Sequence, residues 1–238
     1  MSLTDDLIQG GYLKTPALIQ AFRKIKRSDF LLPGDRNKAD YDAPLTIGYG
    51  QTISQPATVA MMLELLKPSA GDKILDVGSG SGWTTALLAN VVGKQGKVYG
   101  IERIAELKKF GQANVAKYKF IKEGRVTMLL GDGYAGLPQE APFDKILVSA
   151  AAEEIPQKLL EQLKIGGRLV VPVGKQYQSQ EVVVFIKKSK KRFEHQNFPG
   201  FVFVPLVKNW FLSWFNKNDK IFILILKRQT AVHILLIS

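Results

Sequence analysis

Short apolar runs alternate with helical segments through the middle of this chain, and this alternation constrains its fold more than any other feature. It begins at Lys73 and ends at Gly174. The apolar runs are continuous stretches of Val, Ile and Leu, which are typical of parallel strands buried on both faces. Helices between such strands have to cover both sides of the sheet. The pattern therefore predicts an α/β fold with a doubly wound, mostly parallel sheet.

The limits of the expected elements follow from the same pattern. Strands are predicted over residues 73–78, 97–102, 126–132, 143–150 and 166–174. Helices are predicted between them over residues 81–92, 104–120 and 156–163. Two more apolar runs, 181–188 and 201–206, follow without a convincing helix between them. We expect these two runs to close the sheet as a C-terminal antiparallel pair.

The residues before the sheet have a different pattern. A helix is expected over residues 16–25, because its apolar residues share one face, with Thr15 as a plausible N-cap. Residues 32–49 are interrupted by Gly and Pro, so an ordered loop is expected there. A further helix should run from about Ser54 to Lys67, with Ser54 at or near its N-cap.

A glycine-rich turn joins the first strand of the sheet to the following helix and reads Asp76-Val-Gly-Ser-Gly-Ser-Gly82. Glycines allow a backbone to pass close to a ligand, and the helix that follows presents free N–H groups. A ligand should then lie outside the carboxyl ends of the strands. Alone, the turn is equally compatible with no ligand or with a nicotinamide cofactor.

Acidic residues at the ends of the next two strands make the pattern more specific. Glu102 ends the second strand, twenty-four residues after Gly78, where a carboxylate can accept hydrogen bonds from both ribose hydroxyls. Asp132 and Gly133 end the third strand, where they can read an adenine edge. An ordinary Asp-Gly turn would explain Asp132 equally well.

This set resembles the class I family of S-adenosylmethionine-dependent methyltransferases, which implies a Rossmann-like methyltransferase sheet. The turn departs from the G-x-G-x-x-G spacing of dinucleotide enzymes. By the resemblance, Gly78 and Gly80 flank the methionine portion of the cofactor and Glu102 holds its ribose. The cofactor-binding residues are then expected to be Gln51, Thr52, Ile53, Asp76, Gly78, Ser79, Gly80, Glu102, Asp132 and Gly133.

A second motif, Tyr41 to Ser54, lies upstream of the sheet and leads into a helix start. Such a loop can cover a cofactor and offer N–H groups and hydroxyls to an anion. Residue types alone favour a simpler interpretation, in which the loop is packed and Ser54 is only an N-cap.

The order of the residues is more informative than their types, since Tyr41-Asp-Ala-Pro-Leu-Thr-Ile-Gly-Tyr-Gly-Gln-Thr-Ile-Ser54 resembles the signature of protein-L-isoaspartate(D-aspartate) O-methyltransferases. The resemblance extends over roughly residues 4–207 and includes Gly131-Asp-Gly133, Ala141-Pro-Phe-Asp-Lys-Ile, Gly166-Gly-Arg-Leu-Val-Val-Pro-Val-Gly174 and Phe203-Val-Pro-Leu206. It implies a protein-repair enzyme that methylates the free α-carboxylate of isoaspartyl, and of D-aspartyl, residues. These are then converted to normal aspartyl through a succinimide.

The resemblance also assigns roles. Ser54 would be the active-site residue that contacts the substrate carboxylate, and Val204, Pro205 and Leu206 would hold the substrate backbone. Those three residues could equally form a final core strand. Because a carboxylate is already ionised at pH 7, the transfer needs no general base. The two histidines, His195 and His233, lie outside the motifs, and Ser54 is expected to position the substrate without being modified.

Two domain-scale expectations follow. Residues 1–207 should form a single methyltransferase domain, with N-terminal helices and the substrate loop in 1–70 and the cofactor-binding sheet in 71–207. Residues 208–238 are an atypical tail, aromatic at first and then apolar and β-prone. An extension, an oligomer contact and a translated frameshift all remain open for it.

Composition limits the partners. The net charge of +12 suits acidic partners, but no RNP-type motif or zinc-finger spacing supports nucleic-acid binding. Without cysteine there is no thiolate metal site, and no metal is expected. Neither a secretory signal nor a spanning apolar segment is visible, so we expect a cytoplasmic monomer without membrane or nucleic-acid partners, acting on age-damaged proteins.

Three other functions remain open. The first is a class I methyltransferase that acts on RNA or on a small molecule. The second is a nicotinamide-dependent reductase, which the glycine spacing disfavours. The third is a binding protein without enzymatic activity that keeps the fold, although Ser54, Glu102 and Asp132 are all present.

Overall fold

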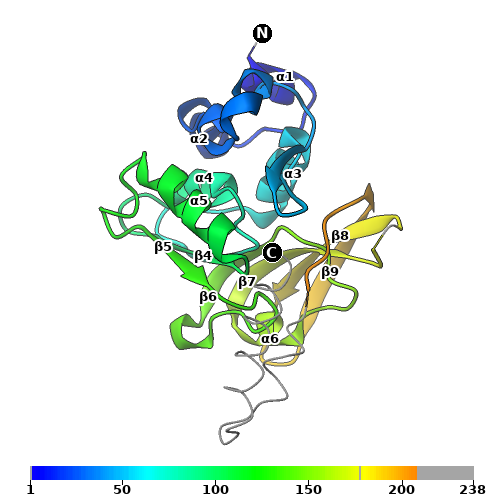
Figure 1. The fold of residues 1–238 in the computed structure, drawn as a ribbon. Helices are drawn as coiled ribbons and strands as arrows, with labels where there is room; N and C mark the ends of the chain where they lie inside the picture. Colours follow the sequence, from blue (N-terminus) through cyan, green and yellow to red (C-terminus); the bar gives the residue numbers. More distant parts are fainter. Residues whose placement is uncertain (1, 177, 208–238) are drawn as a thin grey trace, which may run out of the picture. The chain divides into compact units, whose positions relative to one another are not determined.

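A seven-stranded sheet is the centre of the computed structural model, which describes residues 2–176 and 178–207 (Figure 1). Its strands are β3 (Lys73–Val77), β4 (Lys97–Glu102), β5 (Val126–Leu130), β6 (Phe143–Val148), β7 (Leu163–Val173), β8 (Gln180–Lys187) and β9 (Phe193–Phe201). They lie in the order β5-β4-β3-β6-β7-β8-β9, and β3 to β7 pair in parallel. The predicted doubly wound, mostly parallel sheet is confirmed.

The described helices surround this sheet and precede it in the chain. They are α1 (Leu3–Gln9), α2 (Pro16–Lys24), α3 (Pro56–Leu66), α4 (Trp83–Val92), α5 (Ala105–Ala116) and α6 (Gln157–Glu161). Three short 3-10 helices, η1 (Arg27–Phe30), η2 (Pro33–Lys38) and η3 (Pro138–Glu140), lie in the connections. None of the helices in the described residues is long and apolar enough to cross a membrane.

Both faces of the sheet carry apolar core, as the continuous apolar strands require. Along β3, Ile74 packs with the helices α2 to α5 on one face. Leu75 and Val77 point to the opposite face, where Leu159 and Leu160 of α6 cover them. Figure 1 shows α4 and α5 on one side of the sheet and α6 on the other.

The C-terminal edge of the sheet differs from the prediction. Strand β8 pairs antiparallel with both β7 and β9, so the predicted antiparallel end of the sheet is confirmed. Its last strand is β9, over Phe193–Phe201, so the strand predicted over residues 201–206 was wrong. A short turn closed by the Lys188 N–H and the Arg192 carbonyl (2.8 Å) brings the chain back at once. The predicted run instead crosses the carboxyl ends of the strands, where Leu206 donates a backbone hydrogen bond of 2.7 Å to Ala151.

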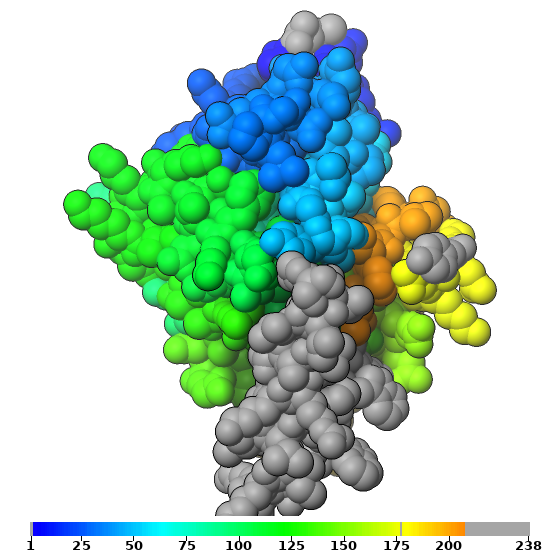
Figure 2. Space-filling model, in the orientation of Figure 1, coloured from blue at the N-terminus to red at the C-terminus, as the bar shows by residue number. Residues whose placement is uncertain are grey.

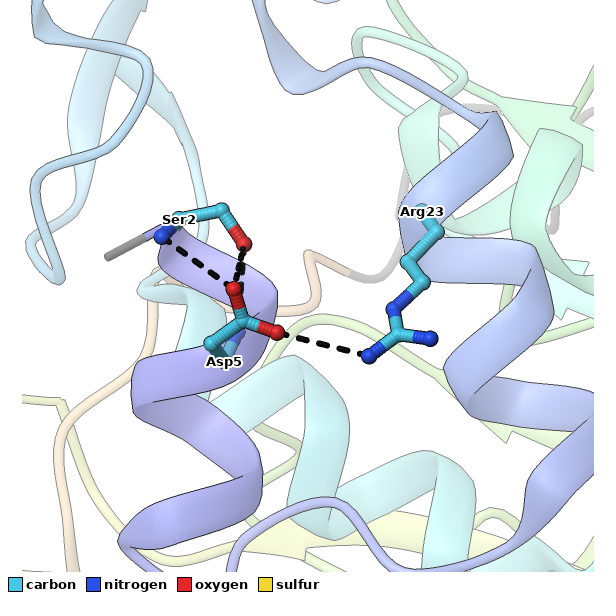
Figure 3. A network of polar contacts seen from close by, with 3 residues as sticks. All are labelled: Ser2, Asp5 and Arg23. Atoms are coloured by element: carbon cyan, nitrogen blue, oxygen red, sulfur yellow. Dashed lines mark hydrogen bonds and ion pairs between the residues drawn. The ribbon is translucent and has the colours of Figure 1, made fainter.

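The N-terminal helices are tied together by polar contacts at their ends. Thr15 is the N-cap residue of α2 as predicted, but its hydroxyl donates to Glu64 of α3 (2.6 Å) and makes no cap bond. In α1, Ser2 and Asp5 form a capping box, and Arg23 of α2 reaches the same Asp5 carboxylate at 3.4 Å (Figure 3). Hydrogen bonds from Ser2 hold the pKa of Asp5 below its usual value.

The predicted loop before α3 contains a two-stranded hairpin. Strands β1 (Leu45–Gly48) and β2 (Gln51–Ile53) pair antiparallel through a turn at Tyr49 and Gly50, whose φ angles are 56° and 68°. Two consecutive positive φ angles are typical of the tightest hairpin turns. In Figure 2 the light-blue region that contains this hairpin borders the orange region that follows β8.

Residues 1–207 group as one compact unit by their internal contacts. Residues 208–238, which the sequence sets apart as an atypical tail, lie outside the described residues.

Candidate active site

A pocket of about 820 Å³, counting its open mouth, lies at the carboxyl ends of β3, β4 and β6. The β1–β2 hairpin and the segment after β9 complete its wall. It therefore brings together motifs that are far apart in the sequence. The predicted site residues that line it are Gln51, Thr52, Ile53, Ser54, Gly78, Ser79, Gly80, Glu102, Gly133, Val204, Pro205 and Leu206.

The glycine turn forms the floor of this pocket. The Gly78 and Ser79 N–H groups both donate to the Ile101 carbonyl, at 2.9 and 3.0 Å, which fixes the turn to the end of β4. A Cβ at Gly80 would lie only 3.3 Å from Ile47 of the hairpin. Glycine at this position therefore lets the hairpin close over the turn.

Glu102 connects the turn to the end of β4. Its carboxylate accepts hydrogen bonds from the N–H groups of Gly80 (3.0 Å), Arg103 (2.7 Å) and Ile104 (2.9 Å), and its side chain is buried. A carboxylate offers about four acceptor positions, so three backbone donors leave room for a further one. Because Glu102 lines the pocket, that donor can come from a bound ligand.

Two of the predicted cofactor-binding acids do not line the pocket. Asp76 is fully buried beneath the turn, where it accepts a 2.6 Å hydrogen bond from the Thr85 hydroxyl. Burial raises the pKa of Asp76 to about 7, the negative charge of Glu102 adds to this effect, and the Thr85 hydrogen bond opposes it. Asp132 accepts from the Tyr134 N–H (2.9 Å), while its neighbour Gly133 does line the pocket.

Ser54 is partly buried and lines the pocket one residue before the N-cap of α3, which is Gln55. The N-terminal turn of α3 is capped by a different side chain, since the Asp42 carboxylate accepts from the Ala57 N–H at 2.8 Å. The simpler interpretation of Ser54 as an N-cap is therefore wrong. Ser54 is therefore not needed as the cap of α3, and it lines the pocket.

The pocket also contains residues that the sequence did not reveal. Ser149 follows β6 directly, and the rule that ligands lie beyond the carboxyl ends of parallel strands could have found it. Ile47 and Trp83 reach the pocket only through the folding of the hairpin and the start of α4, and no local pattern indicates them. Among the residues that the structure describes, no group of three His, Cys, Asp or Glu side chains could hold a metal ion.

Comparison with known proteins gives a consistent family. A family model described as protein-L-isoaspartate(D-aspartate) O-methyltransferase matches residues 1–210. A protein-L-isoaspartate O-methyltransferase of Methanopyrus kandleri is 42% identical over 205 residues, which cover 86% of this chain and 89% of the relative. One from Pyrococcus horikoshii is 43% identical over 197 residues, covering 83% and 87%.

Solved structures agree with the sequence relatives. A crystal structure from Plasmodium falciparum, described as a protein-L-isoaspartate O-methyltransferase in complex with S-adenosyl-L-homocysteine, is similar with a TM-score of 0.77 at 26% identity. The match covers 87% of this chain and 97% of that one. A second structure named protein-L-isoaspartate O-methyltransferase also gives a TM-score of 0.77, at 28% identity, and covers 87% of this chain and 65% of that one.

Proposed function

The chain belongs to the protein-L-isoaspartate(D-aspartate) O-methyltransferase family, and we infer that it repairs proteins by methylating isoaspartyl residues. The methyl group passes from S-adenosylmethionine to the free α-carboxylate of an L-isoaspartyl, or D-aspartyl, residue. The ester then starts the return to normal aspartyl. The observation that carries this proposal is that Ser54, the glycine turn and Glu102 line the same pocket.

The residues of the pocket fit S-adenosylmethionine, which when bound supplies a methyl group on a positively charged sulfur. Glu102 has acceptor capacity for ribose hydroxyls, and Gly78 and Gly80 leave the backbone of the turn accessible to a methionine portion. The Ser79 hydroxyl is buried without a hydrogen-bond partner and borders the same space. Gly133 lies where an adenine edge would be read, with Gln51, Thr52 and Ile53 at the mouth.

The contacts of the two remaining acids suggest supporting roles. Asp76 is bonded to Thr85 of α4, so we assign it to holding the turn on α4 rather than to touching the cofactor. Asp132 shapes the turn that presents Gly133, through its bond to the Tyr134 N–H. Both assignments place these acids behind the backbone that faces the pocket.

The reaction requires positioning rather than proton transfer. A substrate carboxylate has a pKa near 4 and is ionised at neutral pH, so no base has to act on it. The Ser54 hydroxyl can donate a hydrogen bond to one carboxylate oxygen and orient the other toward the cofactor. Alignment of two reactants in this way lowers the barrier by several kcal/mol, up to roughly 7–11 kcal/mol in ideal cases.

The segment after β9 provides a wall for the substrate backbone. Val204, Pro205 and Leu206 line the pocket, and the segment is anchored by backbone hydrogen bonds between Ala151 and both Val204 and Leu206. In the described residues its strand-type pairing is an isolated bridge between Pro205 and Ala151, so it is not a core strand of the main sheet. A wall made of backbone and small apolar groups suits substrates with varied flanking sequences.

The alternative is a class I methyltransferase that acts on RNA or on a small molecule. The Tyr41–Ser54 motif disfavours it, because this motif resembles the signature of the same family whose model matches the chain. A monomeric state, a cytoplasmic location, and the lack of nucleic-acid or membrane partners belong to the proposal as well. Gel filtration and cell fractionation would test them.

Replacement of Ser54 tests the assigned role. In Ser54→Ala, kcat/KM for an isoaspartyl peptide should fall about tenfold to a hundredfold, the effect of one hydrogen bond to a charged group, without abolishing activity. Thr46→Ala is a matched control, because Thr46 is an exposed residue of the same hairpin and does not line the pocket. Full activity of Ser54→Ala would show that Ser54 does not position the substrate carboxylate.

A further inference from the structure

Arg27 is a buried cation that contacts the backbone of the Tyr41–Ser54 motif at both of its ends. Only 4% of the residue is exposed. Its two terminal nitrogens donate to four carbonyl oxygens, those of Ala39 (3.2 Å), Tyr41 (2.8 Å), Ala43 (2.7 Å) and Ser54 (3.3 Å). Three of these carbonyls precede the β1–β2 hairpin and one follows it, so a single side chain fixes where the hairpin leaves and rejoins the body of the protein.

The same guanidinium contacts the cofactor side of the pocket. Its central carbon lies 5.5 Å from the ring centroid of Trp83, in cation–π geometry. Trp83 is the first residue of α4, directly after the glycine turn, and it lines the pocket. Phe22 packs edge-on against the same ring, with centroids 5.6 Å apart. Arg27 therefore links the hairpin to the start of the helix that follows the glycine turn.

The burial and the charge of Arg27 indicate that the shape of its guanidinium group is needed at this position. Burial lowers the pKa of Arg27 to about 10, and the charges of Asp42 and Asp40 oppose this change, so the side chain stays charged at neutral pH. Burying a charge is costly, and an apolar residue of similar size would fill the space at lower cost. An apolar residue cannot hold four carbonyls, however, while the planar guanidinium can bind acceptors on two sides at once.

We propose that Arg27 is a positioning residue for the methyl transfer: it holds residues 39–54 so that Ser54 faces the cofactor pocket. This proposal rests on the proposed function, because it assumes that Ser54 binds the substrate. It assigns to Arg27 no contact with the substrate or the cofactor.

Arg27→Lys is the informative variant, since lysine keeps the charge but offers its donors from one point and cannot hold both groups of carbonyls. Arg23→Lys is the matched control, because Arg23 lies nearby on α2 and its side chain is 62% exposed. Within the described residues its guanidinium is bonded to the surface carboxylate of Asp5. Circular dichroism and urea unfolding of both full-length proteins are measured first, because cofactor binding involves the hairpin residues Gln51, Thr52 and Ile53 and would not report folding alone.

Steady-state kinetics on the folded proteins then separate positioning from stability. For Arg27→Lys we expect the KM for an isoaspartyl peptide to rise about tenfold or more, the effect of losing a charged hydrogen bond. The KM for S-adenosylmethionine should rise less, because Glu102 and the glycine turn belong to the sheet side of the pocket and the hairpin contributes Gln51, Thr52 and Ile53 at the mouth. Hydrogen exchange of the amides in residues 41–54 should become faster in Arg27→Lys and stay unchanged in Arg23→Lys.

The outcomes are distinct. A folded Arg27→Lys with unchanged peptide KM and unchanged exchange in residues 41–54 overturns the proposal. If neither Arg27→Lys nor Arg27→Gln folds by circular dichroism and urea unfolding, Arg27 serves stability and the proposal is also overturned. If the unmodified protein methylates no isoaspartyl peptide, the proposed function fails, while the exchange measurement still decides whether Arg27 positions the hairpin.

Discussion

Buried polar side chains determine which residues reach the pocket and which stay behind it. Asp42, which precedes the hairpin, caps α3, so Ser54 is not needed there and lines the pocket. Asp76 lies beneath the glycine turn and supports it through Thr85. At this scale most of the residues that the sequence predicted for the site line the pocket. The sequence could not predict which acid lines the pocket, because that depends on side-chain partners from other elements.

Asp76 should make the stability of the protein depend on pH. Its pKa is about 7 in the folded protein and 3.8 in the unfolded chain, so the folded state binds the proton more tightly. The resulting stabilisation is complete below the unfolded pKa and is lost as the pH rises through the folded pKa. The contribution of Asp76 to the free energy of unfolding should therefore decline between about pH 4 and pH 7.

Asp76→Asn removes this titration, so its free energy of unfolding should decline less over the same range. Urea unfolding at a series of pH values measures the difference. Asp6→Asn is the control, since Asp6 is an exposed residue of α1. Parallel pH profiles for the unmodified protein and Asp76→Asn would contradict the assigned burial of an ionisable Asp76.

At the scale of elements, the cofactor half of the site depends on how closely α5 approaches the glycine turn. A Cβ at Gly111 of α5 would lie 2.5 Å from the Gly80 carbonyl oxygen and 3.2 Å from the Gly82 nitrogen. Both atoms belong to the backbone of the turn, which cannot move aside as a flexible side chain can. Gly111 thus allows a helix and a ligand-binding turn to pack directly together.

Gly111→Ala should weaken cofactor binding, although the same change in a free helix stabilises it by about 1 kcal/mol. We expect the affinity for S-adenosylhomocysteine, measured by calorimetry, to fall about tenfold or more, since overpacking typically costs 1–3 kcal/mol. Gly34→Ala is the control, because a Cβ at Gly34 would meet nothing within 4 Å. Unchanged affinity for S-adenosylhomocysteine together with a higher Tm would show that the close contact between Gly111 and the glycine turn does not limit cofactor binding.

The elements that the sequence predicted are those with strong local patterns. β3, β4 and β6 begin at the residues expected from their continuous apolar runs, and each ends within two residues of its predicted limit. The hairpin strands β1 and β2 contain only four and three residues, too few to show a period. β9 is a mostly exposed, polar edge strand without an apolar run, so a local pattern favours the neighbouring run 201–206 instead.

For the whole molecule, strand order explains why motifs so distant in the sequence form one pocket. The chain passes from β3 to β4 and β5 on one side and returns to β6 on the other, so the connections diverge at the carboxyl end of β3. Ligands of open α/β sheets bind at such a point. The resemblance to a family indicated the substrate, while the physics of the residues alone supported only a loop suited to an anion.

The most direct test of the function is transfer of a radiolabelled methyl group from S-adenosylmethionine to an isoaspartyl peptide and to its aspartyl twin. The twin has the same composition and charge and lacks only the β-linkage with its free α-carboxylate. We predict base-labile label in the isoaspartyl peptide and none above background in the twin. Label in neither peptide, or equal label in both, would contradict the assignment of this chain to isoaspartyl repair.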